Sequence, residues 1–147
     1  RSSDLLDMVF MCRKKSQHAR SILASLFLVS ATAYAENPSQ IIFNNFTSLA
    51  LDSQLASSPG QGIAANVSKP VNYSLVYWIC YYSGSFNHCP IVFTDKSNGE
   101  KVATVYLNAE TATLTEPPTL YGNYANEYEV RGWETSPLNE ITIVAKA

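Results

Sequence analysis

The stretch that most constrains the fold of this chain runs over residues 71–82. It is rich in aromatic and β-branched side chains, which favour strands, and a short polar loop separates it from the similar run 89–93. When residues 71–82 are assigned alternately to two faces, one face is apolar throughout and the other becomes apolar from Val76 onward. A strand that is apolar on both faces is covered on both sides. The pattern therefore predicts an internal strand, with residues 89–93 as its return strand.

Residues 1–35 have the features of a leader and a secretory signal peptide. A basic segment within residues 13–20 precedes the apolar run 21–29, and residues 33–35 supply the small side chains of a cleavage site. The apolar run is shorter than the roughly 20 residues that span a bilayer, so no stable membrane insertion is expected after cleavage. We expect one domain, residues 36–147, that is secreted or periplasmic in a Gram-negative bacterium.

Two cysteines remain once the signal is removed, Cys80 and Cys89. An even pair in an exported domain predicts a disulfide. Closing so short a loop stabilises a fold by roughly 2.5–3 kcal/mol in the chain-entropy model. We expect the bond to close a hairpin, with Pro90 at the start of the return strand. The spacing fits neither a CxxC redox motif nor a zinc-ligand pattern, so no metal or cofactor is expected.

The remainder of the domain also predicts short strands separated by turns. Residues 57–62 are turn-forming, Pro70 is expected to end a strand, and Asn98-Gly99 between two β-prone runs is a hairpin signal. The expected strands are 41–47, 49–55, 63–67, 71–82, 89–94, 101–108 with its continuation 111–115, 124–133 and 138–144. About eight strands at this spacing favour an all-β fold, an antiparallel β-sandwich of the Ig-like or jelly-roll-like kind. A small β-barrel is the alternative.

The charge of the exported domain argues against a nucleic-acid partner. Residues 36–147 contain five lysine and arginine residues and ten acidic residues, a formal net charge of −5 against −2 for the whole chain. Proteins that bind nucleic acids need a basic face to neutralise phosphates. The clustered basic residues all lie in the predicted leader.

Catalytic residue patterns are sparse. His88 is the only histidine of the exported domain and lies next to a cysteine assigned to the disulfide, so we expect an exposed loop residue rather than the base of a nucleophile. Glu127 and Glu129 share one face of a predicted strand, and paired carboxylates can act in glycoside hydrolysis. A solvated strand face with Arg131 beside them is the simpler interpretation. We therefore expect no enzyme, with a small secreted hydrolase as the alternative.

Two further motifs have simple structural interpretations. Residues 95–100 superficially resemble a calcium loop, but the third position is Ser97 and strands flank it, so a hairpin turn is expected. Asn45, Asn66 and Asn72 each begin a glycosylation sequon, which matters only in a eukaryotic secretory pathway.

Aromatic side chains are the most informative surplus. Many must be buried, but some lie at predicted strand ends and loops, where tyrosine and tryptophan offer contact area at low entropic cost. The candidate binding surface comprises Tyr81, Tyr82, Phe86, His88, Tyr121 and Trp133. The sequence thus predicts a non-catalytic module that binds a protein, or less readily a glycan. A membrane-active or toxin-like secreted protein is a further alternative.

Overall fold

The computed structural model describes residues 37–147, so the predicted leader and its cleavage site lie outside the described residues and stay predictions. Within the described part, no helix is both long and apolar enough to cross a membrane. The described chain consists of ten strands and two helices.

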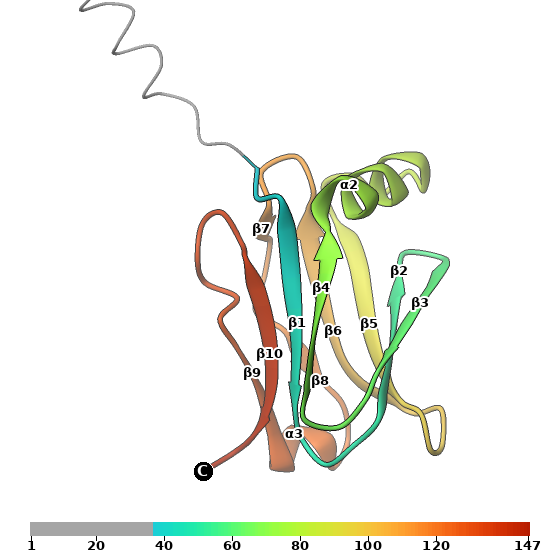
Figure 1. The fold of residues 1–147 in the computed structure, drawn as a ribbon, viewed down its shortest axis with the longest axis vertical. Coiled ribbons are helices and arrows are strands. Elements are labelled where there is room, and N and C mark those ends of the chain that lie inside the picture. The colour runs from blue at the N-terminus through green and yellow to red at the C-terminus, as the bar shows by residue number, and fades with distance from the viewer. Residues whose placement is uncertain (1–36) are drawn as a thin grey trace, which may run out of the picture. The chain divides into compact units, whose positions relative to one another are not determined.

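Two sheets pack face to face (Figure 1). The four-stranded sheet has the order β4-β1-β10-β9, and its strands are β1 (Gln40–Phe46), β4 (Val67–Asn72), β9 (Tyr128–Arg131) and β10 (Glu140–Ala145). The six-stranded sheet has the order β3-β2-β5-β6-β7, with β8 also on β6. Its strands are β2 (Leu51–Leu55), β3 (Ser58–Ile63), β5 (Cys89–Asp95), β6 (Lys101–Asn108), β7 (Thr113–Leu114) and β8 (Thr119–Leu120). The predicted all-β sandwich is confirmed, and the barrel alternative is wrong because the sheets do not close.

The core lies between the two sheets, and it is filled by side chains from alternate positions along the strands. Every second residue of β5 is buried, as expected for a strand with one face on a core. Phe43 of β1 meets Phe93 of β5 edge to face, with ring centroids 5.4 Å apart. One pairing differs from the predicted antiparallel pattern, because β1 and β10 run parallel. These two strands come from opposite ends of the domain, and no tight turn constrains their relative direction.

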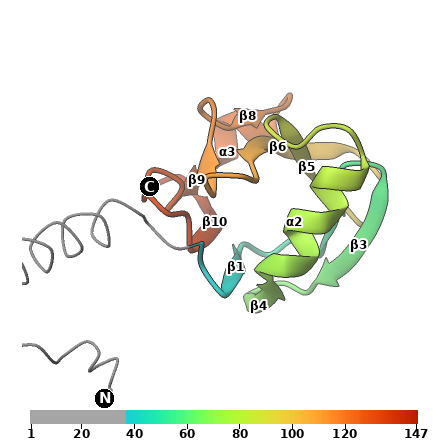
Figure 2. The ribbon, with the colours of Figure 1, turned by 90° about the horizontal axis from the view of Figure 1, so that it is seen from above.

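Residues 71–82 do not form the predicted internal strand. They form the end of β4 and then helix α2 (Tyr73–Tyr82), which lies across one end of the sandwich (Figures 1 and 2). The Asn72 side chain caps the helix, accepting a hydrogen bond from the Ser74 N–H at 2.9 Å. The buried residues Tyr73, Val76 and Cys80 recur at helical spacing. The cap and the packing of this one face override the strand preference of the aromatic residues.

Four other expectations about element boundaries are wrong. The expected turn 57–62 is mostly the edge strand β3. The expected strand 63–67 is mainly the connection between β3, which ends at Ile63, and β4, which begins at Val67. Pro70 lies inside β4 rather than ending it, because an edge strand tolerates a missing N–H. The expected strand 124–133 begins with the short helix α3 (Tyr124–Glu127) and becomes β9 at Tyr128.

The turn 95–100 joins β5 to β6 as predicted. The Asp95 N–H donates to the Glu100 carbonyl at 2.8 Å, and Gly99 adopts a positive φ of 75° that favours glycine. The Asp95 carboxylate accepts hydrogen bonds from the N–H and hydroxyl of Ser97. The hairpin reading of this segment is therefore confirmed.

Asn45, the first residue of a predicted sequon, has a structural role. It is 1 % exposed, and its amide donates to the carbonyls of Leu49, Ile63 and Ala64. Its side-chain oxygen accepts from Thr47. Asn45 thereby fastens the β1–β2 connection to the end of β3.

Candidate functional site

The inner side of helix α2 holds it on the sandwich. Tyr73 is buried, and its hydroxyl donates to the Ala109 carbonyl at 2.5 Å. Burial, with a smaller contribution from Tyr77, raises the pKa of Tyr73 to about 12. The hydroxyl is therefore protonated and available as a donor throughout the physiological range.

The predicted disulfide is present, but its position differs from the expected one. Cys80 and Cys89 are bonded and both are 0 % exposed. Cys80 lies in the last turns of α2 and Cys89 begins β5, so the bond ties a helix to a strand rather than closing a β-hairpin. The helix end and the following loop are thereby held against the six-stranded sheet.

The outer side of α2 carries an aromatic cluster that we call the α2 cluster. Its members are Tyr77, Trp78, Tyr81, Tyr82 and Phe86. Trp78 and Tyr81 meet edge to face at 5.4 Å between ring centroids, and Tyr81 meets Phe86 in the same way at 5.5 Å. Tyr82 is 79 % exposed, and Trp78 is 49 % exposed. Tyr77 and Phe86 are partly buried against the core. The cluster is therefore anchored on its inner side and open to solvent at its three other rings.

Leu75, Trp78 and Tyr82 form the exposed face of α2, which we call the α2 face. Its composition differs from that of the solvent-facing side of an ordinary surface helix. No Asp, Glu, Lys or Arg occurs between Lys69 and Asp95, so neither α2 nor the loop after it carries one of these charges. A surface helix normally presents polar and charged residues to water. Here Leu75, Trp78 and Tyr82 share the exposed face, spaced three and four residues apart. Contiguous exposed apolar surface of this kind marks interaction sites.

A cleft runs along this helix on the side of the β2–β3 connection. It has a volume of about 320 Å³. Its lining residues are Ser57, Ser58, Leu75, Trp78, Ile79, Tyr82 and Ser83. The cleft therefore places a recess directly beside the exposed rings of Trp78 and Tyr82.

Three of the six predicted surface residues come together in the α2 cluster, namely Tyr81, Tyr82 and Phe86. His88 instead stacks on Tyr106 with ring centroids 4.1 Å apart, and its Nε2 lies 3.1 Å from a Glu116 carboxylate oxygen. Trp133 is half-buried against the core after β9.

Sequence reasoning missed Leu75 and Trp78 as members of the exposed face. The period-two reading separated Leu75 from Trp78 and Tyr82 by placing them on opposite sides of a strand. The spacing 75, 78 and 82 is the signal that would have found this face, because such residues lie on one side of a helix.

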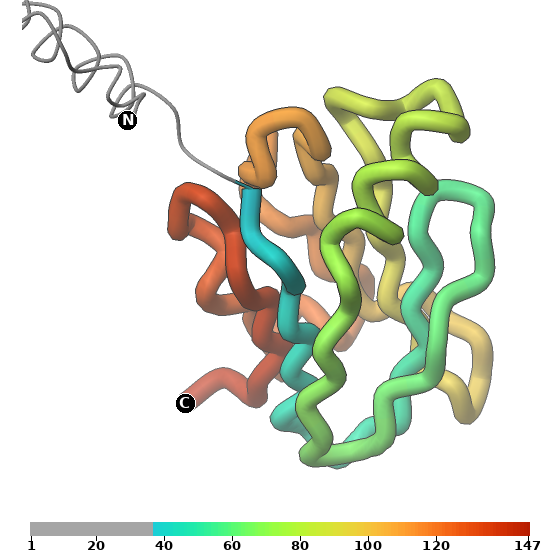
Figure 3. Tube along the Cα trace, turned by 45° about the horizontal axis from the view of Figure 1, so that its top comes forward, coloured from blue at the N-terminus to red at the C-terminus, as the bar shows by residue number. Residues whose placement is uncertain are grey.

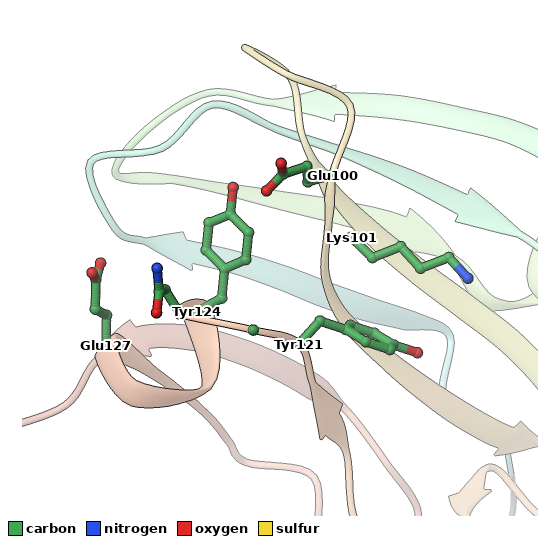
Figure 4. A pocket seen from close by; sticks show the side chains of 7 residues that line it. Glu100, Lys101, Tyr121, Tyr124 and Glu127 are labelled. Atoms are coloured by element: carbon green, nitrogen blue, oxygen red, sulfur yellow. The ribbon is translucent and has the colours of Figure 1, made fainter.

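Tyr121 lines a different hollow, beside α3 (Figure 4). This hollow has a volume of about 490 Å³ and is lined in part by Glu100, Lys101 and Glu127. Figure 4 shows the Tyr124 ring between the two glutamates and Lys101 extending past Tyr121, whose ring centroid lies 5.7 Å from its Nζ.

The Tyr124 ring in that hollow is held by its hydroxyl, which donates to Asp95 at 2.8 Å. Hydrogen bonds from Ser97 and then Tyr124 hold the pKa of the Asp95 carboxyl below its usual value. Figure 1 places α3 at the end of the sandwich opposite α2. Tyr121 therefore belongs to a separate surface from the α2 cluster.

The residues considered for hydrolysis do not converge. Glu127 lies in α3, whereas Glu129 lies in β9 and accepts a hydrogen bond from the Arg131 Nε at 2.6 Å. The prediction that both glutamates share one strand face is therefore wrong. His88 directly precedes β5 of the six-stranded sheet, and its Nε2 lies within hydrogen-bonding distance of a Glu116 carboxylate oxygen. Over residues 37–147, no group of three His, Cys, Asp or Glu side chains is placed to hold a metal ion.

Fold and surface together define a disulfide-linked β-sandwich with an uncharged aromatic helix at one end. A protein-family model described as "T2SS substrate NttC" matches residues 15–135. The chain therefore belongs to the NttC family of type II secretion substrates.

A solved structure supports the fold. The crystal structure of the Legionella pneumophila type II secretion system substrate NttC matches with a TM-score of 0.56 and 22% sequence identity. The match covers 74% of this chain and 99% of that chain. No curated protein matches.

Proposed function

We propose that this protein is exported through the periplasm by a type II secretion system and acts outside a Gram-negative cell. Membership of the NttC family carries the proposal. The disulfide is consistent with it, because such bonds form and persist in oxidising compartments outside the cytoplasm.

The export proposal is tested in the producing bacterium by immunoblotting culture supernatant and periplasm, with and without a functional type II secretion system. We expect protein in the supernatant of the intact strain and retention in the periplasm of the mutant. Equal amounts in both supernatants would refute export by this route.

Outside the cell, we propose that the protein is a non-catalytic binding module whose α2 face docks another protein. The exposed, uncharged aromatic surface of α2 carries this proposal. Tryptophan and tyrosine are the residues most enriched among those that dominate protein–protein binding energy. Depletion of charge at the centre of a patch is the compositional mark of such interfaces.

The α2 cluster is also preorganised. The disulfide anchors the helix end, and the rings pack against one another before any partner arrives. A binding surface whose side chains are already ordered loses less conformational entropy on association. Rigid aromatic anchors beside a recess therefore support binding to a folded protein surface.

A site-specific cross-linking experiment tests this proposal. Tyr82 is replaced by p-benzoylphenylalanine, and the secreted protein is irradiated with the material it meets outside the cell. The matched control places the same group at Phe46, which is 45 % exposed at the far end of β1 from the helix. We expect one protein to be cross-linked from position 82 and not from position 46.

Affinity for that protein is then measured for the double variant Trp78→Ser/Tyr82→Ser and for Phe46→Ser. Loss of two central aromatic contacts should weaken binding by about 30-fold or more, and Phe46→Ser should change it little. Equal weakening by both variants would contradict docking on α2. Cross-linking only to lipid vesicles would favour the membrane-active alternative, and cross-linking only to a second copy would indicate self-association.

A further inference from the structure

A slot lies beneath α2, along the edge where the sandwich is open. Strands β3 and β4 follow one another in the chain but belong to different sheets, and each is the edge strand of its sheet. Figures 1 and 3 show the β2–β3 hairpin standing beside β4 without pairing to it, with α2 across their upper ends. The slot between them has a volume of about 330 Å³.

The walls of the slot are mainly apolar. Its floor includes three buried core residues, Phe43, Leu55 and Ile63. The other lining residues are Ser53, Pro59, Gly60, Gln61, Lys69, Pro70, Val71, Asn72, Leu75 and Ile79. A concave apolar space with a few polar groups is the usual form of a small-molecule site.

Lys69 is the one charged residue among the described residues that line this slot. The register of the strands explains where its side chain points. Lys69 pairs directly with Phe43 across β4 and β1, and directly paired residues of antiparallel strands point to the same face. Phe43 points into the core, so Lys69 also points inward. Among the residues that the structure describes, the Lys69 ammonium forms no ion pair or hydrogen bond. An inward lysine on an edge strand discourages edge-to-edge pairing, but here it also faces an apolar space.

Two other polar side chains that line the slot are already engaged. The Ser53 hydroxyl donates to the Gln61 carbonyl at 3.1 Å, and the Asn72 side chain caps α2. No Asp or Glu lines the slot. The slot therefore contains one ammonium group, that of Lys69, which can still donate hydrogen bonds. Its buried apolar residues favour contact with a hydrocarbon group.

We propose that this slot binds a small apolar molecule bearing one carboxylate, of the medium-chain fatty acid class. The hydrocarbon chain lies on Phe43, Leu55 and Ile63, and the carboxylate accepts a hydrogen bond from the Lys69 ammonium. This ligand site goes beyond protein docking on the outer face of α2, and it stands without it.

The test is an NMR titration of the full protein with three probes that share a chain length, namely sodium octanoate, octan-1-ol and octylamine, each below its micelle concentration. We expect octanoate to bind at least about tenfold more tightly than octylamine, because its carboxylate accepts a charge-assisted hydrogen bond from the Lys69 ammonium, which repels the protonated amine. The amide shifts should concentrate in residues 53–63 and 69–79.

Two lysine variants locate the carboxylate. Lys69→Gln should weaken octanoate about tenfold and leave octanol unchanged. Lys101→Gln, which changes a lysine of the separate hollow beside α3, is the matched control and should have no effect. The preference of the unaltered protein for octanoate tests the charge argument even if Lys69→Gln folds poorly.

The fatty-acid proposal and the protein-docking proposal can be refuted independently of each other. Trp78→Ser/Tyr82→Ser should retain octanoate binding, since neither side chain lines the slot. Octanoate binding no tighter than octylamine, shifts centred outside the slot, or full affinity in a folded Lys69→Gln variant would each overturn the fatty-acid proposal.

Discussion

Removing the Cys80–Cys89 disulfide should destabilise the fold by an amount that follows from the short loop it closes. The two cysteines are nine positions apart, and in the chain-entropy model a loop of this size contributes about 2.7 kcal/mol. Both cysteines are fully buried, so Cys80→Ala/Cys89→Ala also removes two packed sulfur atoms. We expect a total loss of about 3–4 kcal/mol in the free energy of unfolding.

Thermal and urea unfolding followed by circular dichroism measures this loss. A domain of about 110 residues has an unfolding entropy that converts 3–4 kcal/mol into a fall in Tm of about 15 °C. Adding a reductant that cleaves the disulfide of the unaltered protein should also lower its Tm. The same reductant added to the double alanine variant is the control and should shift nothing.

The result that would refute this reasoning is a fall in Tm of less than about 3 °C in the double variant, with an unchanged urea m-value. The helix end would then be held by packing alone, and the bond would constrain the unfolded chain little.

Four substitutions test the polar contacts of the fold. Tyr73→Phe leaves the Ala109 carbonyl without its donor and should cost about 1–3 kcal/mol at pH 7, measured by urea unfolding. Because the folded pKa of Tyr73 is raised to about 12, its contribution is present below pH 10 and is lost as pH rises toward 12, so the variant should lack that alkaline loss. Asp95 has a lowered folded pKa, so its contribution is present above about pH 4 and is lost as pH falls further. Asp95→Asn should flatten this acid dependence of stability, and an unchanged acid limb would count against it. Asn45→Ala leaves buried carbonyls unpaired and should cost at least about 2 kcal/mol. Asn72→Ala removes a helix cap and should cost about 1 kcal/mol, seen as a lower Tm.

Most of the sandwich could be predicted from local patterns, because its strands carry their own signals. The alternation of β5 and the turn that follows it are local features, and they predicted strand and hairpin correctly. The disulfide followed from the cysteine count and the export signal. The parallel pairing of β1 with β10 could not be predicted, because it depends on how two distant strands meet.

Helix α2 escaped prediction for a different physical reason. Its residues have a strand-like composition, and its exposed side is as apolar as its buried side, so the usual contrast between faces is missing. The signals that remained were the Asn72 cap and the spacing of Tyr73, Val76 and Cys80. The exposed aromatic residues of the candidate surface are thus the ones that removed the amphipathic pattern from which the helix could have been predicted.

The two sides of α2 contribute differently to the stability of the fold. Tyr73, Val76 and Cys80 are buried and join the helix to the sandwich through packing, one hydrogen bond and the disulfide. Trp78 and Tyr82 keep about half or more of their surface in water, so their burial contributes comparatively little to folding. Water-exposed apolar surface gains free energy only when something covers it. Stability therefore does not explain the aromatic outer face of α2, and this is the surface on which we propose that another protein docks.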